Sequence, residues 1–251
     1  VLFCKKLAWL SDGSWNLPLK WLRVTSPTEA LPKQSSFHFS QGGYLGLRGE
    51  QGEFVLLTYP RFKFRPSQCD ALHLDFWLDG VNLLRDGGTY SYNAGEKYIN
   101  YYGGSQSHNS IQFDDREQMP RLSRFLLGDW LKGDGVDFDS TLNTCQAAYT
   151  DNIGTKHRRT VSLVKNRLQV KDEVSGFEKR AVLRWRLSPG NWFMEGNLLS
   201  NGIHKIVVKS NVALSRFELK PGKESLYYYQ ESDIPVLEVE INQAGKIFTE
   251  Y

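Results

Sequence analysis

Three positively charged residues alternate with two phenylalanines at the start of a strongly patterned stretch of this sequence. Arg61, Lys63 and Arg65 flank Phe62 and Phe64. Successive side chains of a β-strand point to opposite faces, so we expect a strand whose phenylalanines face a core and whose cations line the other face. Like charges on one face repel each other unless acidic groups lie opposite. The pattern predicts either a groove for an acidic ligand or a solvated face paired with nearby Asp or Glu.

A glycine-rich block and a later histidine supply groups that suit metal binding and proton transfer. Asp86 opens the sequence DGGTY, and His108 lies in the sequence SHNS. Carboxylate and imidazole are both zinc ligands, and an imidazole also exchanges protons near neutral pH, which makes His108 a candidate catalytic residue. The alternative is that Asp86 and His108 form a hydrogen-bonded pair that ties two strands together.

The residues that precede Asp86 predict a β-hairpin. Apolar residues at positions 72, 74, 76 and 78 alternate with more polar ones, and Asp79-Gly80 has the composition of a two-residue turn that matches strand twist. The apolar positions after the turn contain one irregularity, which indicates a bulge. His73 is on the face opposite the leucines. We expect its ring to form a hydrogen bond with a strand neighbour such as Asp75 rather than to bind a metal.

Tyrosines are dense between positions 90 and 102. Tyr90 and Tyr92 share one parity, so on a strand they would face the same side. Aromatic rings stack on sugar rings, and tyrosine hydroxyls bond sugar oxygens. We expect this side to line a groove; the alternative is that the rings pack at the edge of a sheet.

Several of these blocks resemble, in the same order, the C-terminal β-sandwich domain of heparinase II/III-like polysaccharide lyases. They are QCDALHLDFWLDGVNLLRDGGTYSYN, YYGGSQSHNSIQFDDREQM and RFLLGDW. The likeness spans about Gly42 to Trp130 and continues to Tyr251 through strand pattern alone. For a complete protein, the resemblance implies cleavage of acidic, uronate-containing polysaccharide by β-elimination.

That reaction needs a group that neutralises the uronate carboxylate, a base that removes the neighbouring proton, and an acid, often a tyrosine in this family, that protonates the leaving oxygen. The resemblance implies that several of these groups come from an N-terminal helical toroid, which this chain does not supply. The expected partners are therefore an acidic polysaccharide and that toroid of the parent chain, and we expect the isolated chain to be inactive. A periplasmic or cell-envelope location is also implied by the family alone.

The resemblance further implies one zinc ion, held by a histidine, an aspartate and a second histidine. Asp86 and His108 match the last two ligands, while the first falls on Gln68, a poor zinc ligand. The catalytic histidine of the family falls on Pro66, which transfers no proton. These two departures favour an alternative function, a non-catalytic acidic-glycan-binding or scaffold module. The expected substrate-binding residues are Arg61, Lys63, Arg65, Tyr90, Tyr92 and Asn109.

Composition narrows the class of protein. A net charge of +3 over 251 residues is too small for a dedicated nucleic-acid binder, and no apolar run reaches the length of a membrane span. Cys4, Cys69 and Cys145 form neither a CxxC pair nor a disulfide framework. Cys69 is either a buried thiol or a further zinc ligand. The first residues lack an initiator methionine and the layout of a signal peptide, so we expect a fragment of a longer protein.

Turn residues recur every eight to twelve positions or so, which is typical of antiparallel β-sandwiches. We therefore expect an all-β fold, a large multi-stranded antiparallel sandwich over residues 37–251, after a lead-in over residues 1–36. The lead-in contains at most one short helix, within residues 1–10. Expected elements of the sandwich include a hairpin that joins 160–164 to 168–170, and strands over 180–187 and 121–127.

Overall fold

The computed structural model describes residues 13–29, 31, 34–165 and 167–251. The chain divides into two units, Val1–Ser35 and Ser36–Tyr251. In the first unit a 3-10 turn, η1 (Ser14–Asn16), precedes the short helix α1 (Leu17–Trp21). Pro18 lies in the first helical turn, where a main-chain N–H has no helical partner to lose. The helix expected within residues 1–10 lies outside the described residues.

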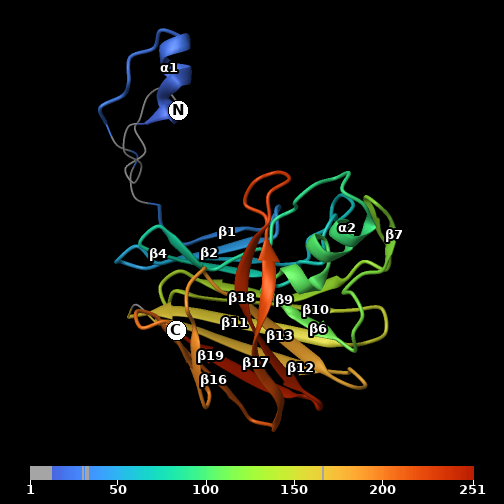
Figure 1. The fold of residues 1–251 in the computed structure, drawn as a ribbon. Helices are drawn as coiled ribbons and strands as arrows, with labels where there is room; N and C mark the ends of the chain where they lie inside the picture. The colour runs from blue at the N-terminus through green and yellow to red at the C-terminus, as the bar shows by residue number, and fades with distance from the viewer. Residues whose placement is uncertain (1–12, 30, 32–33, 166) are drawn as a thin grey trace. The chain divides into compact units, whose positions relative to one another are not determined.

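The second unit is built from antiparallel sheets (Figure 1). A five-stranded sheet has the order β1 (Phe37–Phe39), β2 (Tyr44–Arg48), β3 (Phe54–Thr58), β4 (Leu74–Leu78), β5 (Val81–Leu84). An eight-stranded sheet has the order β14 (Phe193–Glu195), β15 (Leu198–Ser200), β16 (Lys205–Ser210), β19 (Gly245–Glu250), β12 (Arg167–Ser175), β11 (Lys156–Val164), β10 (Thr144–Thr150), β9 (Lys132–Asp139). A four-stranded sheet has the order β17 (Leu214–Glu224), β18 (Ser232–Ile241), β13 (Ala181–Arg186), β6 (Ile111–Phe113). The small elements are the hairpin β7 (Arg121–Ser123) and β8 (Leu126–Leu127), the helix α2 (Glu96–Tyr102) and the 3-10 turn η2 (Ser105–Ser107). The prediction of a large antiparallel all-β fold is confirmed.

The eight-stranded and four-stranded sheets pack face to face. Along β11 and β12 buried side chains alternate with more exposed ones, so each strand gives one face to the core. Trp185 of β13 is fully buried, and its indole N–H donates a hydrogen bond to the Thr249 hydroxyl of β19 at 3.0 Å. The central strand β13 is buried on both faces, so its arginines need polar partners inside the protein. Arg184 is paired with Glu238 at 2.8 Å.

A buried ionic group lies in the same interior. Asp172 of β12 accepts hydrogen bonds from Arg159 Nε at 2.7 Å and from His157 Nε2 at 2.6 Å, and all three side chains are excluded from solvent. The Arg159 guanidinium also lies 4.9 Å from the centre of the Trp185 ring. Burial lowers the pKa of His157, because the charged imidazolium would lose its hydration. The one carboxylate therefore balances the charge of Arg159.

The local turn and strand predictions are largely confirmed. Asp79 and Gly80 join β4 to β5 with φ angles of 49° and 79°, as a two-residue turn with two left-handed residues requires. The register shifts between Phe76 and Trp77, which is the expected bulge. β11 and β12 form the second predicted hairpin, and β13 is the strand expected over 180–187.

Two strand predictions are wrong. The segment from Arg61 to Arg65 is irregular, and Phe64 is 85% exposed instead of facing the core. Pro60 and Pro66 bracket it; proline donates no ladder hydrogen bond and restricts the residue before it. Only Phe62 packs inward, edge-on to Trp130 at 6.0 Å. The expected strand over 121–127 is instead the β7–β8 hairpin.

The edges of the eight-stranded sheet differ in character. At one edge β9 pairs only with β10, with a register shift opposite Gln146 and Ala148. Most of its side chains are exposed, among them Asp134 and Asp137. At the other edge β14 is three residues long.

Cys69 and Cys145 are buried free thiols. Among the described residues no helix has the length and apolarity to cross a membrane.

We expect Asp172→Asn to lower the free energy of unfolding by about 3–5 kcal/mol, because it leaves the buried Arg159 charge without its counter-ion. Denaturant unfolding measures this difference. The control is Glu250→Ala, which breaks the exposed pair with Arg167 and should cost about 0–1 kcal/mol. Equal effects of the two substitutions would contradict the role of Asp172.

Candidate metal centre and ligand pocket

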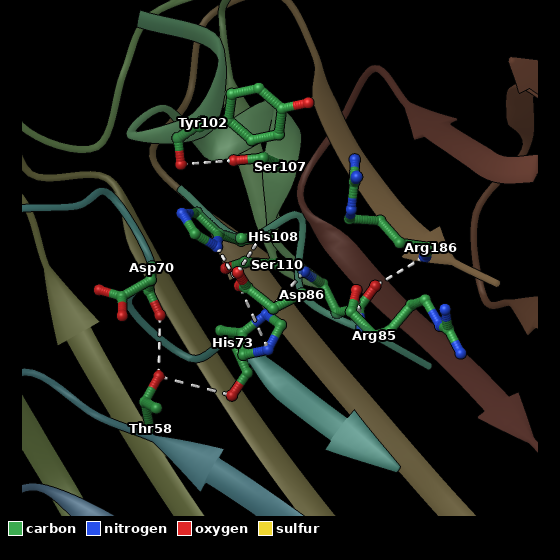
Figure 2. Close-up of polar contacts among 12 residues, drawn as sticks. Thr58, Asp70, His73, Arg85, Asp86, Tyr102, Ser107, His108, Ser110 and Arg186 are labelled. Carbon is green, nitrogen blue, oxygen red and sulfur yellow. Dashed lines mark hydrogen bonds and ion pairs between the residues drawn. The ribbon is translucent and has the colours of Figure 1, made fainter. Parts of the chain in front are cut away.

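Two buried histidines and a partly exposed aspartate meet beside the ends of the five-stranded and four-stranded sheets. His73 immediately precedes β4, Asp86 follows β5, and His108 lies between η2 and β6. One ligand atom of each lies within 4.8 Å of those of the other two. Figure 2 shows the three side chains converging from these separate segments.

One glycine lets the Asp86 turn approach the His108 segment closely, and the next supplies the left-handed backbone conformation of the turn. Gly87 N–H donates to the Ser107 carbonyl at 2.8 Å, and a Cβ on Gly87 would lie 2.6 Å from the Ser107 Cβ. Gly88 has a φ of 80°, and its N–H donates to Asp86 Oδ1 at 2.6 Å. The DGGT sequence thus fixes one carboxylate oxygen and directs the other toward His108.

His108 is fully buried and held by that second oxygen. Its Nδ1 lies 2.6 Å from Asp86 Oδ2, so the ring donates Nδ1–H to the carboxylate. The other ring nitrogen, Nε2, is buried and has no hydrogen-bond partner. Burial opposes ionisation of Asp86, but the nearby His108 and His73 rings prevail and hold the pKa of Asp86 well below its usual range.

His73 is fixed in one tautomer by the main chain. Asn109 N–H donates to His73 Nδ1 at 2.9 Å. A main-chain N–H only donates, so Nδ1 keeps its lone pair and the proton of the neutral ring is on Nε2. This Nε2 is buried, without a hydrogen bond, 3.5 Å from Asp75 Oδ1 and 3.6 Å from Asp86 Oδ2. The expected neighbour Asp75 is therefore near, and Asp86 is equally near.

The group fits a zinc ion in its chemistry. Two imidazoles and a carboxylate are zinc ligands, and each imidazole has a ring nitrogen without a partner. To bind one ion together, Asp86 and His108 would have to give up their mutual hydrogen bond, because the unpartnered Nε2 of His108 lies across the ring from Asp86 Oδ2. His73 would have to move its proton from Nε2 to Nδ1 and lose the hydrogen bond from Asn109 N–H. Gln68, the expected third ligand, is not one of the three; it lies in the wall of two surface hollows. Cys69 is also unsuited, because burial raises the pKa of its thiol to about 12 and its sulfur contacts the Met119 carbonyl.

Asn109 is interior, which corrects its assignment to substrate binding. Its side-chain amide donates to the carbonyls of Leu74 at 2.8 Å and Arg85 at 3.3 Å, and its oxygen accepts from Arg186 N–H at 2.6 Å. The residue is fully buried, so no sugar reaches it. Its role is to join segments that are far apart in the sequence.

Arg159, on β11 of the eight-stranded sheet, forms hydrogen bonds with the same segments. Its Nη1 donates to the carbonyl oxygens of Leu72 at 2.5 Å and Asn109 at 2.6 Å. These residues directly precede His73 and follow His108. The buried ionic group of the eight-stranded sheet therefore holds both histidine segments.

The expected cationic residues surround a separate, open pocket of about 450 Å³. Residues 41–44, 58–68 and 70–71 line it. Arg61, Lys63 and Arg65 are exposed, and Lys63 Nζ donates to the Gln41 side-chain oxygen. None of the three forms an ion pair with an acidic side chain in the described part of the chain. We call this the ligand pocket.

Asp70 is a group of the ligand pocket that the sequence did not single out. Burial raises the pKa of its carboxyl above the usual value. His108, in contrast, is fully enclosed and lines neither the ligand pocket nor the hollow beside it. A polysaccharide does not reach His108 in this structure, which argues against its candidate catalytic role.

The two tyrosines expected to face one side do not do so, because their segment is not a strand. Tyr90 has a left-handed φ of 61° and stacks on Tyr98 at 4.4 Å, with Tyr102 and Tyr229 nearby. Tyr92 is 56% exposed and lines the hollow beside the ligand pocket. Tyr90 is a packing residue, and Tyr92 is the ring available to a ligand.

Comparison with known proteins agrees with this architecture. The family model for the C-terminal domain of heparinase II/III-like proteins matches residues 31–226. The chain belongs to this family. The match confirms the resemblance seen in the sequence.

Individual relatives are distant and longer. A curated heparin-sulfate lyase of Bacteroides stercoris is 26% identical over 184 residues, which are 68% of this chain and 26% of the relative. The heparan sulfate lyase HepC from Pedobacter heparinus has a similar structure, with a TM-score of 0.72 and 17% identity over 99% of this chain and 43% of that one. A heparinase III gene product gives a TM-score of 0.75 and 18% identity over 94% of this chain and 38% of that one. The chain therefore spans about a quarter to two fifths of the length of these relatives.

We expect Asn109→Ala to lower the free energy of unfolding by about 2–4 kcal/mol, since it leaves buried carbonyl and N–H groups of other segments unpaired. The affinity for acidic polysaccharide, measured well below the unfolding temperature, should not change. Asn152→Ala serves as the control, because Asn152 makes an exposed hydrogen bond to Asp129. A loss of affinity without a loss of stability would return Asn109 to the binding residues.

Proposed function

We propose that this domain binds an acidic, uronate-containing polysaccharide and forms part of the substrate-binding cleft of a polysaccharide lyase. The observation that carries this proposal is the ligand pocket, where three exposed cations have no acidic partner among the described residues. Clustered cations without counter-ions raise the free energy of the unbound protein and attract a polyanion. The names of the lyase relatives support the same substrate class.

In the proposed reaction, the chain contributes charge rather than proton transfer. A guanidinium or ammonium beside a uronate carboxylate stabilises the negative charge that develops when the neighbouring C–H is deprotonated. Pro66 lies in the wall of the ligand pocket where the resemblance implies a catalytic histidine, and no histidine lines this pocket. We infer that the base and the acid for the leaving oxygen come from the N-terminal helical domain of the parent protein.

A second candidate is a non-catalytic module that binds acidic glycan, and Pro66 with Gln68 in the pocket wall favours it. The two candidates differ in the product they form. The 251-residue chain should produce no rise in the ultraviolet absorbance of unsaturated uronate under either proposal. A parent protein that includes the helical domain should produce that rise only if it is a lyase, and a rise from this chain alone would contradict both assignments.

The ligand pocket is tested by removing its charges. We expect the triple change Arg61→Ala, Lys63→Ala and Arg65→Ala to weaken binding of a heparin-type polymer about tenfold, because each exposed charge contact is worth on the order of 0.5 kcal/mol. Calorimetry or retention on an acidic-polysaccharide column measures the change. As a control, changing Lys165, Arg167 and Lys205 to alanine removes the same amount of charge from the eight-stranded sheet and its β11–β12 turn. Equal retention of the two variants would remove the ligand pocket from the proposed function.

We also propose that Asp86 and His108 hold a zinc ion, with His73 as the third ligand. When bound, zinc would cross-link three chain segments and act as a local positive charge. The support is the donor set, of which one ligand atom from each residue lies within 4.8 Å of the others. His73 is the weaker ligand because the Asn109 N–H occupies its Nδ1.

The zinc proposal predicts about one equivalent of metal per chain by elemental analysis of protein purified without chelator. His108→Ala should abolish it, whereas His73→Ala should leave a weaker site, with a Kd at least tenfold higher. His204→Ala, remote from the group, should not change the metal content. Metal-free protein that is equally stable with and without added zinc would assign Asp86 and His108 a purely structural role.

A further inference from the structure

A second hollow lies directly beside the ligand pocket. It has a volume of about 90 Å³ and is formed by α2, the β7–β8 hairpin and the segment that follows Asp86. Ser67 and Gln68 line both hollows. Ser91, Tyr92, Arg121, Arg124 and Phe125 line the second hollow but not the ligand pocket.

The two arginines of this hollow have different tasks. Arg121 donates to the Arg124 carbonyl and to the Gly103 carbonyl, both at 3.2 Å, and so holds the hairpin against α2. Arg124 makes one hydrogen bond, from Nη1 to the Asn93 side-chain oxygen at 2.8 Å. No described acidic side chain pairs with Arg124. Its charge is uncompensated, and most of its N–H donors are available to an oxyanion.

An aromatic ring is fixed beside this cation. Tyr92 packs edge-on to Phe125 at 6.0 Å and lies 6.2 Å from the Tyr228 ring. The Tyr228 hydroxyl accepts hydrogen bonds from Tyr92 N–H at 3.4 Å and from the Ser91 hydroxyl at 3.2 Å. The backbone and neighbours of Tyr92 are therefore held, while over half of its surface stays exposed. A ring held in this way loses little conformational entropy when a sugar stacks on it.

We propose that this hollow is a second subsite for the same anionic polysaccharide, in which Arg124 binds an acidic group and Tyr92 stacks on a sugar ring. The inference rests on the proposed function of the ligand pocket and extends it. A polymer with an acidic group on repeating sugars can place charges at both hollows while crossing Ser67 and Gln68. Occupying both subsites by one molecule makes the second contact intramolecular, so affinity should rise with chain length.

The acidic group is either a carboxylate or a sulfate, which Arg124 recognises through the same oxyanion geometry. Heparin and chemically desulfated heparin distinguish them. If the effect of Arg124→Ala is present with both polymers, the group is a carboxylate. If it appears only with the sulfated polymer, the group is a sulfate.

The test uses the 251-residue chain and heparin oligosaccharides of defined length, with binding measured by calorimetry. In the wild-type protein, affinity should rise at least tenfold from a tetrasaccharide to an octasaccharide. We expect Tyr92→Ala/Arg124→Ala to remove most of this gain and lower octasaccharide affinity about tenfold, with tetrasaccharide binding at the ligand pocket unchanged. Both side chains are on the surface, and a thermal unfolding scan verifies that the variant is folded.

The matched control is Phe248→Ala/Arg167→Ala, which removes one exposed ring and one exposed arginine from the eight-stranded sheet. If the two double variants bind the octasaccharide equally, the second subsite is wrong. If the triple variant at Arg61, Lys63 and Arg65 loses affinity while Tyr92→Ala/Arg124→Ala does not, the proposed function stands without the second subsite. If neither variant loses affinity, both the ligand pocket and the second subsite are wrong.

Discussion

The candidate centre depends on the contacts that the Arg159 guanidinium makes. The guanidinium is paired with Asp172 on one side, and on the other it donates to the carbonyls next to both histidines. Burying a charge is costly unless every donor finds a partner. Here the partners belong to the sheet and to the two histidine segments, so the arginine is satisfied only when these parts are assembled together.

Asn109 completes this assembly from the other side. Its main-chain N–H sets the His73 tautomer. Its side chain joins β4 at Leu74, the residue before Asp86, and β13 at Arg186. These hydrogen bonds join distant segments and favour one arrangement of the interior. Asp86 and His108 are therefore held in place whether or not a ligand is bound.

Binding and the buried group are separated in space. The cations of the ligand pocket are on an irregular, proline-bracketed segment, exposed and free to meet a polymer. His73, Asp86 and His108 do not line this pocket. Such a division suits the proposed function, in which the surface attracts the polysaccharide, the interior keeps the supporting loops in place, and proton transfer is assigned to the helical domain.

Sequence reasoning succeeded where local patterns decide structure. The Asp79-Gly80 turn and the alternation along β11 and β12 follow from two-residue turn geometry and from burial of one strand face. The proximity of Asp86 and His108 was also expected. The prediction failed at Arg61–Arg65, where the alternation was outweighed by the flanking prolines.

Sequence reasoning also failed where the hydrogen-bond partners of a residue are distant in the sequence. Asn109 looks like a surface polar residue, and only the fold reveals that Leu74, Arg85 and Arg186 satisfy its amide. In the same way, His73 rather than Gln68 joins the interior group. One-dimensional matching to a family assigns a position but does not determine which side chain reaches a given point in space.

The acidic outer strand β9 has a consequence for how the domain behaves at high concentration. A free sheet edge is a template for pairing with another molecule, and natural proteins discourage this with charge, bulges and short strands. The exposed Asp134 and Asp137 put negative charge on this edge, and the bulge, which lies within β9 itself, disturbs the ladder that a second molecule would need. The three-residue β14 gives little length for pairing at the opposite edge. The sheet therefore resists fibre growth by edge addition, even though it is wide and has no barrel closure.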